Sequence, residues 1–174
     1  MKKNIFYLSI LLFFVFIFAI FYIGLDKPNL YKPNEVKNKK LEDFISTELF
    51  SNKQFNSKDI IENNNFTLIN IWSSWCAPCR SEHAILMNLS KKKNLNIVGL
   101  NYKDKKNNAI KFLDELGNPF SKNLIDPDGI ISISLGAYGV PESFLLNNKS
   151  RIIKKYIGPL TSEDISEILK IIQS

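Results

Sequence analysis

Two cysteines separated by two residues are the side chains of this sequence best suited to chemistry. Cys76 and Cys79 are the only cysteines, and His83 is the only histidine. Haem attachment needs a histidine directly after the second cysteine, where this chain has Arg80. A structural zinc site needs four ligands, and one histidine cannot complete it. A purely stabilising disulfide would close a very short loop and so remove little entropy from the unfolded chain. A redox pair remains as the favoured interpretation.

The residues around the pair are suited to thiol chemistry. The pair lies between a predicted strand and a predicted helix, so Cys76 is expected at a helix N-terminus, where free N–H groups and the helix dipole stabilise a thiolate. Pro78, in the first turn, costs no helical hydrogen bond. Cys79 lies one turn further on, within disulfide reach. Cys76 would attack a partner disulfide, and Cys79 would resolve the mixed disulfide. Arg80 is either a positive charge that helps the thiolate or a solvated helix residue.

Length and composition bound the classes of protein to which the chain can belong. Its 174 residues allow one domain of ordinary size, and its composition is globular. Two cysteines are too few for a disulfide scaffold. The net charge is +6, but the basic residues are scattered and are not interleaved with aromatic side chains. Nucleic-acid binding is therefore not expected.

The N-terminus carries a long apolar segment. Ile5 to Leu25 contains no charged residue, and as a helix rising ~1.5 Å per residue it would match a bilayer core of ~30 Å. A cleaved signal peptide is the rival interpretation, but its apolar region is shorter and ends in a small-x-small site that is missing here. Lysines flank both ends, so charge alone leaves the orientation open. We predict a transmembrane signal anchor at 1–25, a tether at 26–40 and a domain at 41–174.

The elements that must position the cysteines follow from the apolar pattern. Little order is expected before residue 66, apart from a strand or turn and a short helical patch near 57–62. Strands are predicted at 66–72, 95–100, 143–146 and 152–157. Helices are predicted at 77–92, at 106–116 closed by Gly117, at 130–135 and at 161–173. This order, β-α-β-α-β-β-α with a final hairpin and a short helix before it, predicts an α/β fold with a mixed sheet covered by helices.

Three stretches of the sequence together resemble a known family. They are WCAPCRSEH at 75–83, VGLNYKD at 98–104 and GAYGVPESFL at 136–145. The first and the later Val-Pro pair are similar to the thioredoxin superfamily in general. All three in order, behind an apolar N-terminus, resemble the membrane-anchored thiol:disulfide oxidoreductases of cytochrome c maturation, the DsbE (CcmG) type. The resemblance runs from about residue 66 to the C-terminus and implies a thioredoxin-like fold.

The resemblance also implies roles for residues outside the cysteine pair. Pro141 matches the cis-proline that faces the redox pair, and Val140 before it would offer its backbone to a substrate strand. Glu82 and Glu142 match acidic residues that lie near the pair, where carboxylates would raise thiol pKa values and could shuttle protons. For Glu82, a solvated helix residue is the alternative. Asn70 occupies the position at which thioredoxins carry a buried acid.

Further residues near the pair have simpler expected roles. Trp75 is expected to shield the pair from water, and Trp72 to belong to the core. His83 is expected to be a packing or surface residue. Ala77 and Pro78 form the variable dipeptide that influences the reduction potential. No metal and no cofactor is expected apart from the redox-active Cys76–Cys79 disulfide.

Partners and location are implied by the same resemblance. The expected role is a reductant on the periplasmic side of the inner membrane, acting on apocytochrome c or on a thiol-bearing subunit of the haem-ligation machinery. Electrons would come from a membrane thiol reductase of the DsbD/CcdA kind. One alternative is a reductase for other periplasmic substrates. Another, from a different class, is a copper-delivery protein on the same fold, but the spacing of the two cysteines is one residue short for it and no histidine follows His83.

Overall fold

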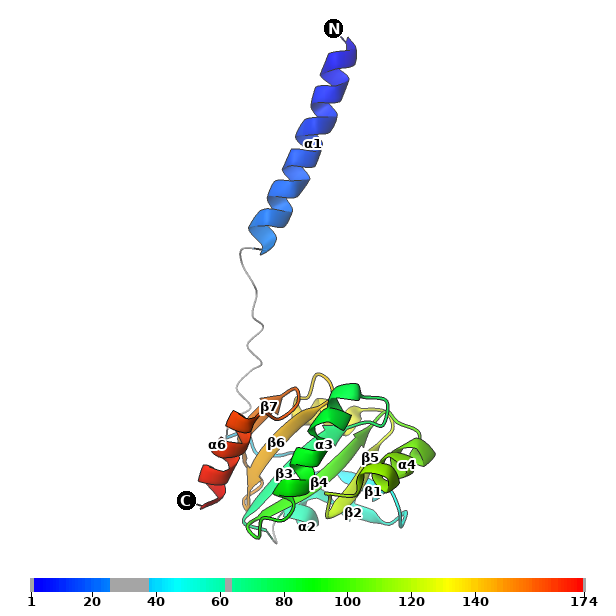
Figure 1. Ribbon diagram of the computed structural model, residues 1–174, viewed down its shortest axis with the longest axis vertical. Coiled ribbons are helices and arrows are strands. Elements are labelled where there is room, and N and C mark those ends of the chain that lie inside the picture. The colour runs from blue at the N-terminus through cyan, green and yellow to red at the C-terminus, as the bar shows by residue number, and fades with distance from the viewer. Residues whose placement is uncertain (1, 26–37, 62–63, 174) are drawn as a thin grey trace. The chain divides into compact units, whose positions relative to one another are not determined.

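The computed structural model describes residues 2–25, 38–61 and 64–173 (Figure 1). The described residues of the N-terminal unit form one helix, α1 (Lys2–Leu25). Within it, Asn4–Tyr22 is long and apolar enough to cross a membrane, a property that signal sequences share. The predicted helix is therefore present. Most of the predicted tether, 26–37, lies outside the described residues.

The second unit is built on one sheet of seven strands in the order β2-β1-β5-β4-β3-β6-β7. The three central strands, β3, β4 and β5, are parallel, and β6 and β7 continue the sheet antiparallel. The sheet is therefore mixed, as the sequence predicts. The strands are β1 (Ile45–Glu48), β2 (Gln54–Asn56), β3 (Phe66–Trp72), β4 (Leu95–Tyr102), β5 (Lys122–Asp126), β6 (Glu142–Asn147) and β7 (Ile152–Ile157).

Helices cover both faces of this sheet (Figure 1). One face packs against α3 (Ala77–Leu89), α4 (Lys106–Leu116) and α6 (Ser162–Gln173). The other packs against α2 (Ser57–Ile61) and α5 (Ile130–Leu135). Side chains of a strand alternate between faces, so Leu68 and Trp72 of β3 join the α3 face while Ile69 and Ile71 join the α5 face.

Helix ends follow local chemistry. Gly117 ends α4 with a φ of 86°, a conformation that glycine adopts without steric cost. At the start of α6, the Thr161 hydroxyl accepts the N–H of Asp164, whose carboxylate accepts the N–H of Thr161 in return. These reciprocal bonds satisfy backbone donors that a helix start leaves unpaired.

The structure adds elements that the sequence pattern does not indicate. The helix expected at 77–92 ends at Leu89, and the strand or turn expected before residue 66 is the β1–β2 hairpin. The strand β5 was not predicted. β5 is short and partly polar, and only its pairing with β4 and β1 makes it a strand. The last residues of the predicted tether are bound to the domain, since the Asn38 N–H donates to the Ile152 carbonyl and Lys40 bridges Arg151.

Candidate functional site: the cysteine pair and the loops around it

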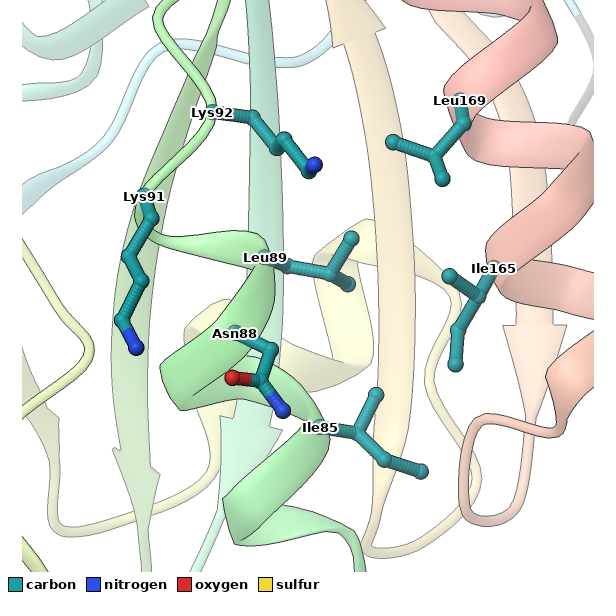
Figure 2. Close-up of a pocket in the computed structure, with 7 residues that line it drawn as sticks. All are labelled: Ile85, Asn88, Leu89, Lys91, Lys92, Ile165 and Leu169. Carbon is teal, nitrogen blue, oxygen red and sulfur yellow. The ribbon is translucent and has the colours of Figure 1, made fainter.

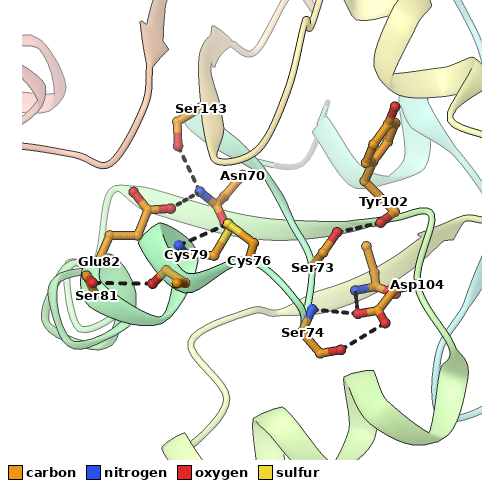
Figure 3. Close-up of a disulfide and its surroundings, with 12 residues drawn as sticks. Asn70, Ser73, Ser74, Cys76, Cys79, Ser81, Glu82, Tyr102, Asp104 and Ser143 are labelled. Atoms are coloured by element: carbon orange, nitrogen blue, oxygen red, sulfur yellow. Dashed lines mark hydrogen bonds between the residues drawn. A yellow bond between two sulfur atoms is a disulfide. The ribbon is translucent and has the colours of Figure 1, made fainter.

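The two cysteines form a disulfide at the start of α3 (Figure 3). Their sulfurs are 2.06 Å apart and their Cα atoms 5.3 Å apart. Cys76 is the N-cap of α3, and the backbone N–H of Cys79 donates to its Sγ at 3.1 Å. Both residues are nearly buried, with 4% and 2% of their surface exposed. The N–H that now faces Cys76 Sγ is placed to stabilise a thiolate on that sulfur after reduction.

The segment Ser73–Trp75, just before Cys76, is held by the loop at the end of β4. The Ser73 hydroxyl donates to the Tyr102 carbonyl, and the Trp75 indole N–H donates to the Lys103 carbonyl at 3.1 Å. The Asp104 carboxylate accepts both the backbone N–H of Ser74, at 2.5 Å, and its hydroxyl, at 2.8 Å (Figure 3). Residues 102–104 are therefore hydrogen-bonded to residues 73–75. These bonds fix the position of the backbone that leads into Cys76.

Glu82 lies beneath the pair on the α3 face and is 1% exposed. The side-chain amide of Asn70 donates to its Oε1 at 2.9 Å, and the Leu160 N–H donates to its Oε2 at 2.8 Å. Burial raises the pKa of Glu82 above its ordinary value, and these two hydrogen bonds oppose the rise. The solvated alternative for Glu82 is therefore wrong. Asn70 also donates to Ser143 on β6 and so joins the helix to the sheet.

Glu142 lies on the opposite face of the sheet. It begins β6 and pairs with Ile71, whose side chain belongs to the α5-side core, whereas both cysteines belong to the α3-side core. Its Oε1 accepts the N–H groups of Tyr138 and Gly139, at 2.9 and 3.1 Å. Its Oε2 lies 2.8 Å from Nζ of Lys155 on β7, and both side chains are nearly buried. Glu142 is thus committed to an ion pair and to the loop before Pro141.

The peptide bond between Val140 and Pro141 is cis, as the resemblance implies. Val140 is partly buried and packs against both apolar cores. The Pro141 carbonyl accepts the N–H of Gly158 at 3.0 Å, which ties the loop to the end of β7. The strand-binding role of Val140 stays a prediction.

Trp75 and Arg80 lie on the surface beside the pair. Trp75 is 59% exposed. Arg80 forms an exposed ion pair with Glu115 at 2.8 Å, and its guanidinium lies over the Phe112 ring. Its charge is therefore shared with α4, which favours the solvated interpretation. Both side chains line a shallow pocket of about 320 Å³ between the start of α3 and one side of α4.

Trp72 and His83 are packing residues. Trp72 is 2% exposed and stacks on Phe120 with ring centroids 5.6 Å apart, so the core prediction is confirmed. His83 is 4% exposed, and its Nε2 lies 2.9 Å from the Gly117 carbonyl. Burial lowers the pKa of His83, and the nearby Arg80 charge lowers it further, against the Gly117 hydrogen bond. His83 is therefore a buried packing residue.

A second hollow lies away from the disulfide. Between the C-terminal half of α3 and one face of α6 is an apolar groove of about 450 Å³ (Figure 2). Ile85 and Leu89 face Ile165 and Leu169 across it, and Lys91 lies at its rim (Figure 2). Neither cysteine lines this groove, so it is not part of the redox site.

Sequence reasoning missed two charged residues of the site, Asp104 and Lys155. Asp104 is the last residue of the stretch 98–104 that resembles the family, but nothing in the linear sequence indicates that it binds the segment before Cys76. Lys155 had a usable signal. Neighbouring residues of a strand face opposite sides of a sheet, and helices pack on both sides, so one of the consecutive residues Lys154 and Lys155 could be expected to be buried. In the structure it is Lys155, while Lys154 is exposed.

Among the described residues no group of three or more histidine, cysteine or acidic side chains could hold a metal ion. The reactive group that the structure shows at the site is the Cys76–Cys79 disulfide. A reduced Cys76–Cys79 pair can exchange with another disulfide without any other reactive group.

Comparisons with known proteins agree with this geometry. The family model described as Redoxin matches residues 36–172. The thiol:disulfide interchange protein CycY of Rhizobium leguminosarum is 48% identical over 101 residues, which are 58% of this chain and 54% of that protein. DsbE of Escherichia coli is 39% identical over 117 residues, 67% of this chain and 63% of that protein. These matches thus cover less than two thirds of either relative.

Solved structures show the same fold. The crystal structure of a putative DsbE from Chlorobium tepidum superposes with a TM-score of 0.66 at 25% identity, covering 79% of this chain and 96% of that one. A DsbF homologue from Corynebacterium diphtheriae gives 0.69 at 23% identity, covering 83% and 96%. The thioredoxin-like fold expected from the sequence is therefore confirmed. The chain belongs to the Redoxin family and is a DsbE/CcmG-type protein of the thioredoxin superfamily.

Proposed function

We propose that this protein is a membrane-anchored thiol:disulfide oxidoreductase that works in the periplasm as a reductant. The observation that carries the proposal is the Cys76–Cys79 disulfide at the start of α3, with an N–H aimed at Cys76 Sγ. The relatives named thiol:disulfide interchange proteins support the activity. The apolar helix Asn4–Tyr22 supports the anchor.

The exchange proceeds in two balanced steps. The Cys76 thiolate attacks one sulfur of a partner disulfide, a Cys76–partner bond forms, and the other partner sulfur leaves as a thiolate. The Cys79 thiolate then attacks Cys76 Sγ, the Cys76–Cys79 bond forms, and the first partner sulfur leaves. The partner gains two electrons and, with two protons, ends as a dithiol. The protein is left oxidised, as in the structure described here.

The substrate we propose is the cysteine pair of apocytochrome c, or a disulfide on a thiol-bearing subunit of the haem-ligation machinery. Haem can attach only to reduced thiols, and the periplasm is oxidising, so a reductant is needed there. A membrane thiol reductase of the DsbD/CcdA kind would restore the dithiol with two electrons and two protons. The resemblance to the DsbE type supports these partners.

Trapping of partners tests the proposal. The Cys79→Ser variant cannot resolve the mixed disulfide, so the full chain expressed in cells should accumulate covalent complexes that mass spectrometry identifies. Apocytochrome c or a haem-ligation subunit is the expected partner. The Cys76→Ser variant is the matched control and should trap nothing. Complexes formed only by the Cys76→Ser variant would reverse the assignment of the two cysteines, and capture of other periplasmic proteins alone would favour a broader reductase.

A copper titration tests the alternative from a different class. Two thiols at this spacing are expected to exchange disulfides and not to hold copper tightly. Under anaerobic conditions the reduced protein should reduce the disulfides of insulin. Tight stoichiometric Cu(I) binding without any insulin reduction would overturn the proposed function.

A further inference from the structure

A buried ion pair holds the loop that precedes Pro141. Glu142 and Lys155 lie 2.8 Å apart, with 3% and 8% of their side chains exposed. Glu142 lies on β6 and Lys155 on β7. Phe144, two residues after Glu142, is the register partner of Lys155, so both charged side chains lie on the same face of the sheet. Burying two charges is unfavourable unless they are paired and hydrogen-bonded. Stability alone is therefore a weak explanation for this buried pair.

The bonds of this pair all lead to the loop 136–140. The Lys155 ammonium donates to the Gly136 carbonyl at 2.7 Å, and the Glu142 carboxylate accepts the N–H groups of Tyr138 and Gly139. Three backbone groups of a five-residue loop are therefore bound by one ion pair. Both members of the pair therefore help to hold the shape of this loop.

The same ammonium supports an exposed aromatic ring. Nζ of Lys155 lies 4.2 Å from the centroid of the Tyr138 ring, which is a cation–π distance. Tyr138 is nevertheless 57% exposed. An exposed tyrosine held from below is a rigid apolar platform, the kind of side chain that dominates protein recognition.

We propose that Lys155 is a positioning residue for capture of a polypeptide partner. Paired with Glu142, it fixes the loop 136–140 so that the backbone of Val140 and the ring of Tyr138 together receive an extended, partly apolar segment around the partner's disulfide. Lys155 lies on the α5 face, away from the cysteines, and does not touch the sulfurs. The inference rests on the proposed thiol exchange and adds to it the residue that shapes its binding surface.

Two disulfide probes separate capture from chemistry. Hydroxyethyl disulfide has no peptide backbone to bind, whereas a synthetic peptide with an oxidised Cys-x-x-Cys-His segment does. For Lys155→Met in the full chain, we expect the fall in kcat/KM with the peptide to exceed the fall with hydroxyethyl disulfide by about tenfold, mainly through KM. Lys155→Arg, which keeps the charge, should recover most of the loss.

The neighbouring lysine provides a matched control. Lys154 forms an exposed ion pair with Glu167 on α6, so Lys154→Met should leave both reactions unchanged. Where Lys155→Met folds poorly, the double variant Glu142→Gln, Lys155→Met removes the unpaired charge and should still show the raised KM for the peptide. Equal loss on both probes, or no loss on either, would overturn the role of Lys155. Failure of the wild-type protein to reduce either probe would instead overturn the proposed function.

Discussion

Glu82 and Glu142 are equally buried, but they lie on opposite faces of the sheet and are stabilised in different ways. Glu82, on the α3 face with the cysteines, has two neutral donors and a raised pKa. Glu142, on the α5 face, has a cation 2.8 Å away. The first keeps its proton more readily beneath the disulfide, while the second is paired with Lys155 and shapes a loop. Two residues that the resemblance treats alike are therefore suited to different tasks.

Removing the charge of Glu142 should have the largest effect on stability. The Glu142→Gln variant leaves the Lys155 ammonium buried without its counter-ion, so the free energy of unfolding should fall by about 3 kcal/mol. Denaturant unfolding of the oxidised full chain measures this. Adding Lys155→Met to the same variant should recover part of the loss. A loss below about 1 kcal/mol would mean that the pair is not buried as a unit.

The pH dependence of stability should identify Glu82. Its folded-state pKa is raised above 4.5, so the folded protein keeps a proton that the unfolded chain has lost. This contribution to stability is fully present below pH 4.5 and is lost as the pH rises through the raised pKa. Wild type should therefore lose stability over this window relative to Glu82→Gln, in unfolding experiments at several pH values. Parallel curves for the two proteins would contradict the raised pKa.

Thiol reactivity should respond to charge on either face. Alkylation of the reduced protein by iodoacetamide at fixed pH reports the thiolate fraction of Cys76. Glu82→Gln and Glu142→Gln each remove negative charge and should raise the rate, by about twofold to tenfold for Glu82→Gln because it lies on the same face as the cysteines. Lys155→Met should lower the rate. The double variant of Glu142 and Lys155, which is neutral like the wild-type pair, should lie between the single variants. A larger increase in rate for Glu142→Gln than for Glu82→Gln would contradict the expectation that Glu82 has the stronger influence on the Cys76 thiolate.

Removing one member of an exposed ion pair should have the smallest effect on stability, and it gives a reference for the buried pair. Arg80 and Glu115 also lie 2.8 Å apart, but both are about half exposed. Glu115→Gln should therefore change the free energy of unfolding by less than about 1 kcal/mol, because water screens the pair. The same denaturant measurement applies. A loss as large as that of Glu142→Gln would remove the contrast between buried and exposed pairs.

Much of the fold could be predicted from the sequence, because several elements carry strong local signals. The strands at 66–72 and 152–157 and the helix at 106–116 with Gly117 are confirmed. Their apolar spacing and end residues are readable without any partner. Lys122–Asp126 lacks such a signal, since it is short and half polar, and its strand conformation depends on β4 and β1.

The reactive centre could also be predicted, because its chemistry is local. Cys76, Pro78 and Cys79 lie within a single turn at the start of a helix, so spacing alone brings the two sulfurs together. The partners of that centre could not be predicted in the same way. Asp104 is far from Ser74 in the sequence and meets it only because β3 and β4 are parallel neighbours.

The redox pair, the order of the main elements and the apolar N-terminal helix can be read from the sequence, because each depends on residues close together in the chain. The face of the sheet on which each glutamate lies, and the partners that it contacts there, depend on how the strands pair. That outcome follows from strand alternation and register: Asn70 faces Glu82 across one side of β3, while Ile71, the next residue, lies beside Glu142 on the other. A shift of β6 by one residue against β3 would turn Glu142 to the α3 face, while Glu82 on α3 would stay where it is.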